Sequence, residues 1–394
     1  MFLDDPRQRP FTVPRRQTTA VKLLVFAHTP PPHHGQSQMV RLLLEGFAND
    51  PAYGIECHHV NARFSDRVED IGGFQPGKIF RLLKFCAQAV WLRFRHGVKN
   101  FYYIPAPGKR SAVYRDWLVL LLCRPFFRRI IFHWHAAGLA EWLARPAQKH
   151  LRGPTGLALR GADLSIALSE YNRADAERFS ARKITIIHNG IPDPCPDFTR
   201  VKPSSGNVVN VLFLALCSRE KGLFDAINGV LLANRTLAAQ SSPMSLRLTI
   251  AGNFVTDADR AEFDRLLAQD DNSKIVRHLG FVDGEKKSAL LREADVFCFP
   301  TFYPNENQPV NLIEAMAFGL PIVTTRWRSL PEMLPRDYPG LVPPRSPEAI
   351  AKALIALATA DTGRELRENF LQRFTLKRHL AALAEALRTV ETAR

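Results

Sequence analysis

The feature that most restricts how this chain can fold is an alternation of short apolar runs with longer helix-like stretches, which occurs in both halves of the sequence. In the first half the predicted strands are 21–28, 55–60, 100–104, 130–133, 163–168 and 184–187. In the second half they are 209–215, 246–251, 274–279, 296–300 and 321–325, with helices near 221–238, 256–269, 285–292, 309–318 and 347–358. Strands that alternate with helices form parallel sheets with helices on both faces. The sequence therefore predicts an α/β protein with two doubly wound parallel sheets.

A proline-rich segment separates the two halves. Residues 191–207 read IPDPCPDFTRVKPSSGN, with four prolines and a Ser-Ser-Gly, which is typical of a linker. The expected division of the chain is an N-terminal tail at 1–19, a first domain at 20–190, the linker at 191–207, a second domain at 208–374 and a final helical segment at 375–394.

The N-terminal sequence, the longest apolar run and the cysteine spacing indicate the cellular location of such a protein. The N-terminus, MFLDDPRQRPFTVPRRQ, contains no apolar core of the kind that a signal peptide needs. The longest uncharged apolar run near the middle, 117–123, has seven residues, whereas a membrane-spanning helix needs about 20. The six cysteines form no C-x-x-C pair, which favours reduced thiols. We expect a cytoplasmic protein with no membrane-spanning segment.

The most informative local pattern is NENQPVNLIEAMAFGLPIVTT, residues 305–325. Pro309 suits the first position of a helix, where a missing N–H costs nothing. The N–H groups of Val310, Asn311 and Leu312 would then be open at the positive end of the helix dipole. Such a helix start binds anions, so it could hold a diphosphate.

Two carboxylates flank this helix start. Glu306 would lie beside a sugar attached to the diphosphate, and Glu314, further along the helix, would reach nucleoside hydroxyls. Two glutamates at this spacing alone are more often a solvated loop followed by an ordinary helix. Here the pattern continues with Gly319, Pro321 and the strand-like residues 322–325, which makes the binding interpretation stronger.

With that extension, residues 305–325 resemble the donor-site signature of retaining glycosyltransferases of the GT-B fold, in particular family 4 (glycosyltransferase group 1 type). The stretch 279–300, which starts with Leu-Gly-Phe-Val and ends with Ala-Asp-Val-Phe-Cys-Phe-Pro, is similar to the sequence that precedes this signature in the family. His188-Asn189-Gly190 resembles the turn at the family's interdomain hinge, where glycine allows an unusual backbone conformation. The resemblance covers about residues 20–390 and is closer in the second half.

The family resemblance implies both an architecture and a reaction. The architecture is two Rossmann-like domains facing a central cleft, with the last helix packed back on the first domain. The reaction is transfer of a sugar, with retention at the anomeric carbon, from a UDP- or GDP-linked donor to a glycan or lipid-linked saccharide in surface polysaccharide biosynthesis. No metal or cofactor is expected, and the single D-x-D, Asp257 and Asp259, fits a helix cap better than a cation site.

Loops that follow strands carry further candidates, because ligands of doubly wound sheets bind beyond the carboxyl ends of the strands. Gly35 matches the first glycine of the family's Gly-Gly, whereas Gln36 replaces the second. His135, in the H-x-H-x-x-G of residues 133–138, resembles the family's sugar-facing histidine, and by alternation His133 points the same way. Without the resemblance, a satisfied core histidine would be the simpler interpretation.

The resemblance assigns catalytic roles to Glu306, His135 and Lys221. It assigns donor binding to Gly35, Arg219, Lys221, Asn307, Gln308, Pro309, Val310, Asn311, Leu312 and Glu314. The weak match is Leu216, which stands where the family has an arginine. Either Arg219 replaces that guanidinium, whose two parallel hydrogen bonds a lysine cannot reproduce, or the leaving group is less well stabilised.

Positive charge is concentrated in the first half of the chain. Residues 1–200 contain 29 Lys and Arg and 16 Asp and Glu, a net charge of +13 out of +15 for the whole chain. Between 78 and 99, basic residues alternate with large apolar ones, and Arg124-Pro-Phe-Phe-Arg128-Arg129 has the same mixture. This pattern suits peripheral contact with the anionic inner face of a membrane. The alternative is a solvated helix face over a domain core. Nucleic acid is not expected as a partner, because no base-reading module accompanies the charge.

Other function classes stay open at this stage. A GT-B nucleotide-sugar epimerase would share the architecture and need no acceptor. A non-catalytic nucleotide-sugar-binding homologue would keep Glu314 and the helix start but lose leaving-group stabilisation, which Leu216 permits. A dinucleotide dehydrogenase is disfavoured, because no G-x-G-x-x-G opens either domain.

Overall fold

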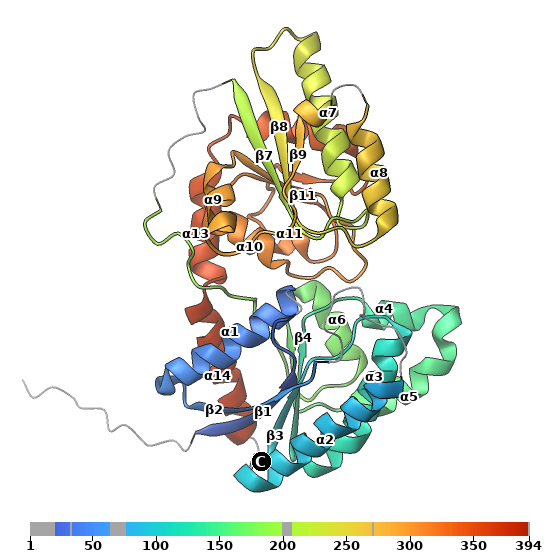
Figure 1. The fold of residues 1–394 in the computed structure, drawn as a ribbon. Helices are drawn as coiled ribbons and strands as arrows, with labels where there is room; N and C mark the ends of the chain where they lie inside the picture. Colours follow the sequence, from blue (N-terminus) through green and yellow to red (C-terminus); the bar gives the residue numbers. More distant parts are fainter. Residues whose placement is uncertain (1–19, 32–33, 64–75, 199–206, 270–271, 393–394) are drawn as a thin grey trace, which may run out of the picture.

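The computed structural model describes residues 20–31, 34–63, 76–198, 207–269 and 272–392. They form two lobes, stacked one above the other in Figure 1, and each lobe is built on a six-stranded parallel sheet. The strand orders are β2-β1-β3-β4-β5-β6 in the N-lobe and β12-β11-β10-β7-β8-β9 in the C-lobe. The predicted α/β fold with two doubly wound sheets is confirmed. The predicted tail 1–19 and residues 199–206 of the predicted linker lie outside the described residues.

The N-lobe alternates strands and helices along the chain. Its strands are β1 (Val21–Ala27), β2 (Ile55–Asn61), β3 (Asn100–Tyr103), β4 (Arg129–Trp134), β5 (Leu164–Ala167) and β6 (Ile184–Ile186). Its helices are α1 (Gly35–Asn49), α2 (Pro76–His96), α3 (Arg110–Cys123), α4 (Leu139–Ala144), α5 (Lys149–Leu159) and α6 (Glu170–Arg178). Short 3-10 helices include η2 (Arg124–Phe126), which follows α3.

The C-lobe repeats this alternation. Its strands are β7 (Val208–Leu214), β8 (Ser245–Ala251), β9 (Val276–His278), β10 (Val296–Phe299), β11 (Ile322–Thr325) and β12 (Leu341–Val342). Its helices are α7 (Leu223–Ala239), α8 (Asp257–Leu267), α9 (Gly284–Glu293), α10 (Val310–Ala317), α11 (Leu330–Met333), α12 (Pro347–Leu357) and α13 (Gly363–Arg373), and α14 (Leu376–Thr392) ends the chain. Each predicted strand is found within two residues of its expected ends, whereas β12, α11 and α13 were not predicted.

Helices cover both faces of the N-lobe sheet. On one face, Phe26, Phe101 and Phe132 belong to a core shared with helices α2 to α6. On the other face, Leu23 and Val25 belong to a core shared with α1 and α14. A strand buried on both sides needs apolar residues at successive positions, which is why these strands are continuous apolar runs in the sequence.

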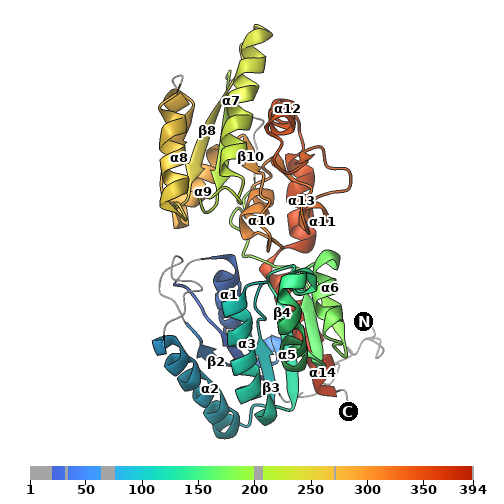
Figure 2. The same ribbon diagram turned by 90° about the vertical axis from the view of Figure 1, so that its right-hand side faces the viewer.

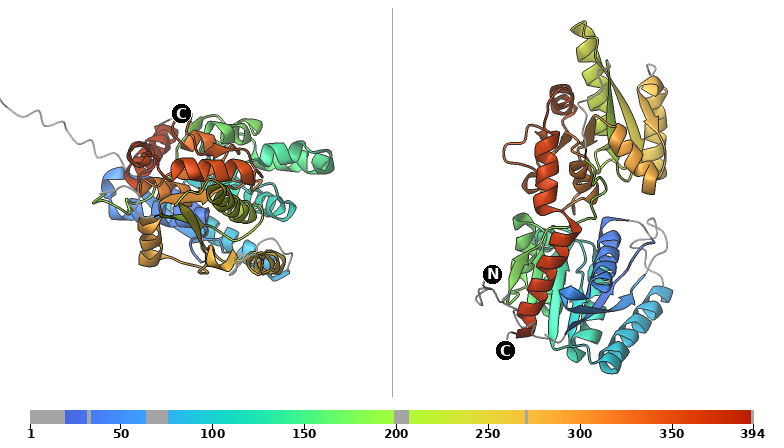
Figure 3. Two further views of the ribbon diagram at one scale, coloured as in Figure 1. Left: turned by 90° about the horizontal axis from the view of Figure 1, so that it is seen from above. Right: turned by 90° about the vertical axis from the view of Figure 1, so that its left-hand side faces the viewer.

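The chain crosses between the lobes twice, and the two crossings lie side by side. The Ile191 N–H donates to Phe374 O at 2.9 Å, and the Leu376 N–H donates to Ile191 O at 2.7 Å. After the second crossing, α14 runs down along the N-lobe, as the right-hand view of Figure 3 shows. Its apolar side chains, which include Leu380 and Leu383, are buried in the core under β1 and α1.

Gly190 precedes the first crossing, and the structure changes the expected reason for a glycine there. Gly190 is not among the residues with positive φ, so the expectation of an unusual backbone conformation is wrong. Instead, a Cβ at this position would lie 2.5 Å from Thr375 O and 2.6 Å from His379 Cβ. Glycine is needed because the second crossing passes too close for a side chain.

Replacing Gly190 by alanine should therefore destabilise the protein, because the nearest atom is a main-chain oxygen that cannot rotate away. We expect a loss of about 1–3 kcal/mol, the usual cost of overpacking, seen as a lower urea midpoint. Gly156→Ala is the matched control, since its added methyl would have nothing within 4 Å, and its midpoint should stay the same or rise. Equal midpoints for the wild type and the Gly190 variant would contradict this account of the crossing.

Candidate functional site

Loops from the two sheets meet at the boundary between the lobes. The loop after β4 contacts the loop after β10, where the Ala137 N–H donates to Asn305 O at 3.4 Å. The start of α1 approaches the start of α10, since a Cβ at Gly35 would lie 3.6 Å from the Val310 side chain. Figure 2 shows α1 and α10 on the facing sides of the two lobes. Because ligands of doubly wound sheets bind beyond the carboxyl ends of the strands, these loops define the candidate site.

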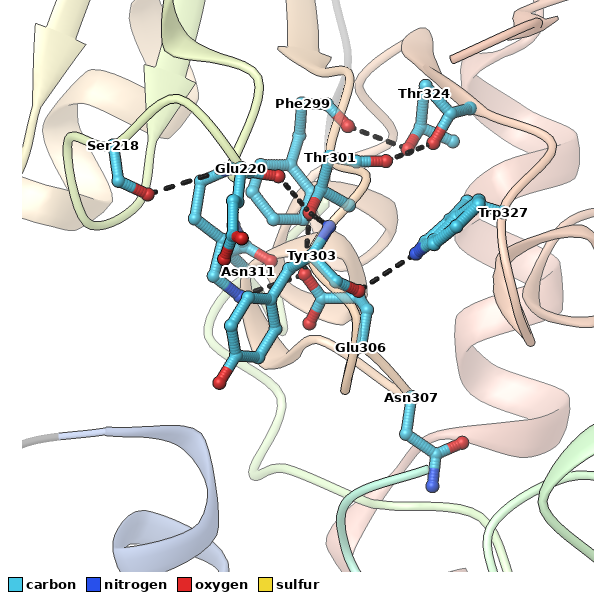
Figure 4. Close-up of polar contacts among 12 residues, drawn as sticks. Ser218, Glu220, Phe299, Thr301, Tyr303, Glu306, Asn307, Asn311, Thr324 and Trp327 are labelled. Atoms are coloured by element: carbon cyan, nitrogen blue, oxygen red, sulfur yellow. Dashed lines mark hydrogen bonds and ion pairs between the residues drawn. The ribbon is translucent and has the colours of Figure 1, made fainter. Parts of the chain in front are cut away.

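Glu306 is the central charged group on the C-lobe side. The Lys221 ammonium and the Thr301 hydroxyl both donate to Glu306 Oε2, each at 2.8 Å, and Figure 4 shows Thr301 beside the carboxylate. Glu306 is only 6% exposed, and the ammonium lies 4.5 Å from the centre of the Tyr303 ring. A buried carboxylate is stable only if it is paired and hydrogen-bonded, and these two donors meet that need. The structure thus brings together Lys221 and Glu306, which are 85 residues apart in the sequence.

Close backbone contacts bring Lys221 to this place. The Phe302 N–H donates to Glu220 O at 2.9 Å. Gly222 has a φ of 81°, and a Cβ there would lie 2.2 Å from Pro300 O. The loop after β7 can therefore lie directly on the end of β10 only with glycine at 222.

Sequence reasoning did not identify Thr301 and Tyr303 as site residues. Both follow directly after the buried strand β10, and this position is the signal that could have found them. The Tyr303 carbonyl accepts a hydrogen bond from the Trp327 indole at 2.8 Å (Figure 4), which fixes the main chain of the residue whose ring Lys221 contacts.

The start of α10 differs by one residue from the prediction. Pro309 is the N-cap and has an extended backbone, and the helix begins at Val310. The Leu312 N–H donates to Pro309 O at 3.2 Å, so the expectation that this amide is open is wrong. The N–H groups of Val310 and Asn311 donate to no group within the described part of the chain. Two amides therefore remain for an anion instead of three.

Side chains on α10 hold this helix start in place. Asn311 donates from Nδ2 to Leu214 O at 2.7 Å, which ties the first turn to the end of β7. Leu312 is fully buried, so it serves packing rather than contact with a ligand. Glu314 lies one turn further along and accepts from the Lys287 ammonium at 2.5 Å. This pair positions a partly exposed carboxylate beside the helix start.

Asn307 and Gln308 do not turn toward Lys221, as donor-binding residues would. Asn307 donates to Trp134 O at 3.2 Å and accepts from the Ser169 hydroxyl at 3.2 Å. Gln308 accepts from the Asn189 N–H at 2.9 Å. Both side chains bind the N-lobe, so the structure gives them a role in joining the lobes.

Further contacts join the lobes near α6. The Glu332 carboxylate accepts from the N–H groups of Glu170 and Tyr171, both at 2.8 Å, and so caps the start of α6 from the other lobe. Arg328 donates to Glu141 at 2.5 Å, and its own side chain is almost completely buried. These contacts hold the orientation in which Val310 faces Gly35.

Arg219 does not join Lys221 and Glu306. Its guanidinium pairs with Glu262 on α8, is exposed, and lies 4.8 Å from the centre of the Phe224 ring. The position found for Arg219 therefore does not support the idea that it replaces the arginine missing at Leu216. Asp257 and Asp259 lie in the first turn of α8, but the N-cap is Thr256, whose side chain accepts from the Asp259 N–H at 3.0 Å. The expectation that the D-x-D itself caps this helix is therefore wrong.

Histidines line the N-lobe side of the boundary. The rings of His133 and His135 lie 4.2 Å apart, which confirms that the two side chains share one side of the strand. Burial, together with His379, lowers the pKa of His135 to about 3. At neutral pH His135 is therefore uncharged, so it can exchange hydrogen bonds with a sugar but does not act as a cation.

A second histidine pair lies at the start of α1. His34 is the N-cap residue beside Gly35, and its Nδ1 accepts from the Ser37 N–H at 3.3 Å. The other nitrogen, Nε2, must then carry the proton and donates to His28 Nε2 at 2.8 Å. Neither histidine was predicted as a site residue.

The buried histidines predict that folding is sensitive to acid. Burial lowers the pKa of His379 to about 4, whereas an unfolded histidine has a pKa of about 6.5. The unfolded chain binds more protons between these values, so stability is full above about pH 6.5 and is lost as the pH falls toward 4. His379→Asn has no titrating ring and keeps a donor for the His188 carbonyl. Its free energy of unfolding should fall less than that of the wild type between about pH 7 and 4.5, by on the order of 2 kcal/mol. Parallel urea-unfolding curves for both proteins across this range would contradict the prediction.

The described residues lack two other kinds of feature. They contain no group of three or more His, Cys, Asp and Glu side chains that could hold a metal ion. Within the same ranges, no helix has the length and apolar character to cross a membrane.

Comparison with known proteins finds a matching family and curated relatives. Residues 211–360 match the family described as Glycosyl transferases group 1. The putative colanic acid biosynthesis glycosyltransferase WcaL of Escherichia coli K12 is 28% identical over 248 residues, which are 58% of this chain and 58% of that protein. The chain thus spans little more than half the length of this curated relative.

Solved structures share the fold over most of the chain. Sucrose-phosphate synthase from Thermosynechococcus elongatus has a TM-score of 0.67 at 20% identity, covering 95% of this chain and 100% of that one. HepE of Anabaena, solved in complex with UDP and glucose, has a TM-score of 0.64 at 17% identity, covering 94% and 100%. The predicted GT-B architecture is therefore confirmed, as is the resemblance to group 1 glycosyltransferases.

Proposed function

We propose, on the premise that residues 211–360 form a Glycosyl transferases group 1 domain within a GT-B fold, that this protein transfers a sugar from a nucleoside diphosphate donor to a saccharide acceptor. The donor is UDP- or GDP-linked, and the sugar keeps its anomeric configuration. The acceptor belongs to a glycan under assembly, the class of product named for WcaL. The reaction needs no metal or other cofactor.

This proposal rests on one observation: the Lys221 ammonium and a helix start with open amides, that of α10, both lie on the C-lobe side of the boundary between the lobes. Lys221 is fixed by Glu306, and the start of α10, with the open amides of Val310 and Asn311, follows Glu306 within the same loop. A lysine and a helix start together bind a diphosphate through charge and through directed N–H groups.

The remaining groups can be placed around such a diphosphate. Glu314, held by Lys287, would accept hydrogen bonds from the ribose hydroxyls. Glu306 Oε2 holds Lys221 and Thr301, and no described residue donates to Oε1, which leaves that oxygen for a sugar hydroxyl. His135 would contact the sugar from the N-lobe, next to Gly35 at the start of α1.

The charges of these groups suit the reaction. Breaking the bond between the anomeric carbon and the diphosphate develops negative charge on the leaving group and positive charge on the sugar ring. Lys221 and the two amides would stabilise the leaving group, because they are already oriented before the reaction. A neutral His135 does not oppose the positive charge on the ring, whereas an imidazolium would.

A non-catalytic sugar-nucleotide-binding protein is the second candidate, favoured by the position of Arg219. Leu216 supplies no guanidinium, and Arg219 pairs with Glu262 instead of approaching Lys221. In the proposed enzyme, Lys221 therefore carries a larger share of leaving-group stabilisation than a lysine assisted by an arginine.

A comparison of two variants tests this proposal. Lys221→Met should lower kcat by about 100-fold or more, the typical loss when one preoriented charge-stabilising donor is removed. Arg219→Met removes the same charge from the neighbouring exposed position and is the matched control, with kcat within about twofold of the wild type. Rates of donor cleavage, with and without a saccharide acceptor, are measured with UDP- and GDP-linked sugars, and unfolding temperatures show whether both variants are folded.

The outcomes separate the candidates. Equal losses in the two variants would mean that Arg219 moves to the leaving group, against the geometry described. Nucleotide binding without turnover in the wild type would favour the non-catalytic protein. A new sugar formed without any acceptor would point to an epimerase.

We propose more specifically that the acceptor is a lipid-linked saccharide at the inner face of the membrane. It is supported by the excess of positive charge in the first half of the chain, +13 within residues 1–200. The proposed enzyme would work there as a cytoplasmic protein in peripheral contact with the bilayer.

A further inference from the structure

The N-lobe carries large exposed apolar side chains that the proposed transfer reaction does not use. One side of α2 is buried against the sheet through Leu82, Cys86 and Ala89. The opposite side exposes Phe80, Leu83, Trp91 and Phe94, with exposed fractions of 72%, 46%, 58% and 67%. Their spacings of three and eight residues place them on a single stripe of the helix. α2 is therefore apolar on two opposite sides, and the core accounts for one of them.

Elements that neighbour α2 also expose large apolar side chains. α3 packs beside α2, as Figure 2 shows, and exposes Leu118, Leu121 and Leu122. The ring of Phe126 in η2 lies 6.1 Å from that of Phe94, and the Arg93 side chain donates to Phe126 O at 2.8 Å. We name the set the α2–α3 surface: Phe80, Leu83, Trp91, Phe94, Leu118, Leu121, Leu122 and Phe126.

The exposed charge within the segment that forms this surface has one sign. Residues 76–140 contain twelve Lys and Arg but one acidic residue, Asp116. Asp116 is buried and accepts from the Tyr103 hydroxyl at 2.7 Å and from the Ala106 N–H at 2.6 Å. The exposed surface formed by residues 76–140 therefore carries no negative charge of its own.

Exposed basic side chains lie beside the apolar stripe. Arg81, Lys84 and Arg95 follow one edge of it along α2, and none of them pairs with a carboxylate in the described ranges. The side chain of Lys78 lies outside the described residues.

The second basic cluster, 124–129, contributes less charge than its sequence suggests. Arg124 donates to Ala158 O at 2.8 Å, and Arg129 is buried 3.6 Å from Asp163, so Arg128 supplies the exposed charge.

Three kinds of partner can be compared for such a surface. A large exposed apolar patch marks an interaction site. A second copy of the chain would set the same positive surface against itself, because the partners of a two-fold dimer use the same patch. Nucleic acid would match the basic residues but not the phenylalanines and leucines. A bilayer with anionic headgroups matches both, because the headgroups attract the cations and the interface accepts Trp, Phe and Leu.

We propose that the α2–α3 surface docks on a lipid bilayer that contains anionic phospholipids. Phe80, Trp91 and Phe94 enter the interfacial region, while Arg81, Lys84 and Arg95 lie among the headgroups. This docking goes beyond the transfer reaction and does not depend on it, because lipid binding needs neither donor nor acceptor.

Co-sedimentation with vesicles tests the docking. The wild-type protein should bind vesicles of phosphatidylcholine mixed with phosphatidylglycerol, bind vesicles of phosphatidylcholine alone at least about tenfold more weakly, and lose affinity as salt is raised. The triple variant Phe80→Ser, Trp91→Ser, Phe94→Ser should bind the anionic vesicles at least about tenfold more weakly. The triple variant Arg81→Glu, Lys84→Glu, Arg95→Glu should lose the preference for anionic vesicles.

Matched changes in the C-lobe provide the controls. Leu371→Ser replaces an exposed leucine and Lys352→Glu reverses an exposed charge, both far from the α2–α3 surface in the sequence, and neither should change vesicle binding. Unchanged unfolding temperatures and unchanged donor cleavage would show that the α2 variants are folded, and would separate failure of the docking from failure of the transfer reaction.

Several results would overturn the docking. One is equal binding to neutral and anionic vesicles, and another is binding of the α2 variants at wild-type affinity. A wild-type dimer in sedimentation velocity that the Phe80, Trp91 and Phe94 changes dissociate would instead make this surface a contact between two copies of the chain.

Discussion

The pairing of one buried carboxylate with one cation organises the proposed donor site. Glu306 is almost completely buried, so a loss of its partners would leave an uncompensated charge that costs several kcal/mol. The partners are Lys221, from the loop after β7, and Thr301, at the end of β10. The glycine at 222 lets these two loops touch. Satisfying the carboxylate therefore also fixes the cation against the loop that leads into α10.

Successive residues of the loop that contains Glu306 have different roles. Glu306 turns into the C-lobe, Asn307 and Gln308 bind the N-lobe, and Val310 and Asn311 present their amides at the start of α10. A change in the angle between the lobes would consequently move the carboxylate and the amides together. Five consecutive residues, 307–311, thus connect the contacts between the lobes to the amides that are proposed to bind the diphosphate.

The sequence was sufficient for features that depend on local pattern. The strands could be placed because parallel strands buried on both faces are continuous apolar runs, and the common side of His133 and His135 follows from strand alternation. The directions of Asn307, Gln308 and Arg219 could not be predicted, because they depend on which lobe or helix offers the nearer partner. The role of Gly190 likewise depends on a second crossing that comes 185 residues later, at Thr375.

The most direct test of this account is a crystal structure of the protein with UDP or GDP bound. The account predicts that the terminal phosphate accepts hydrogen bonds from the Val310 and Asn311 N–H groups and from the Lys221 ammonium, with the ribose hydroxyls at Glu314. A diphosphate bound away from Lys221, with the start of α10 covered by protein side chains, would contradict it.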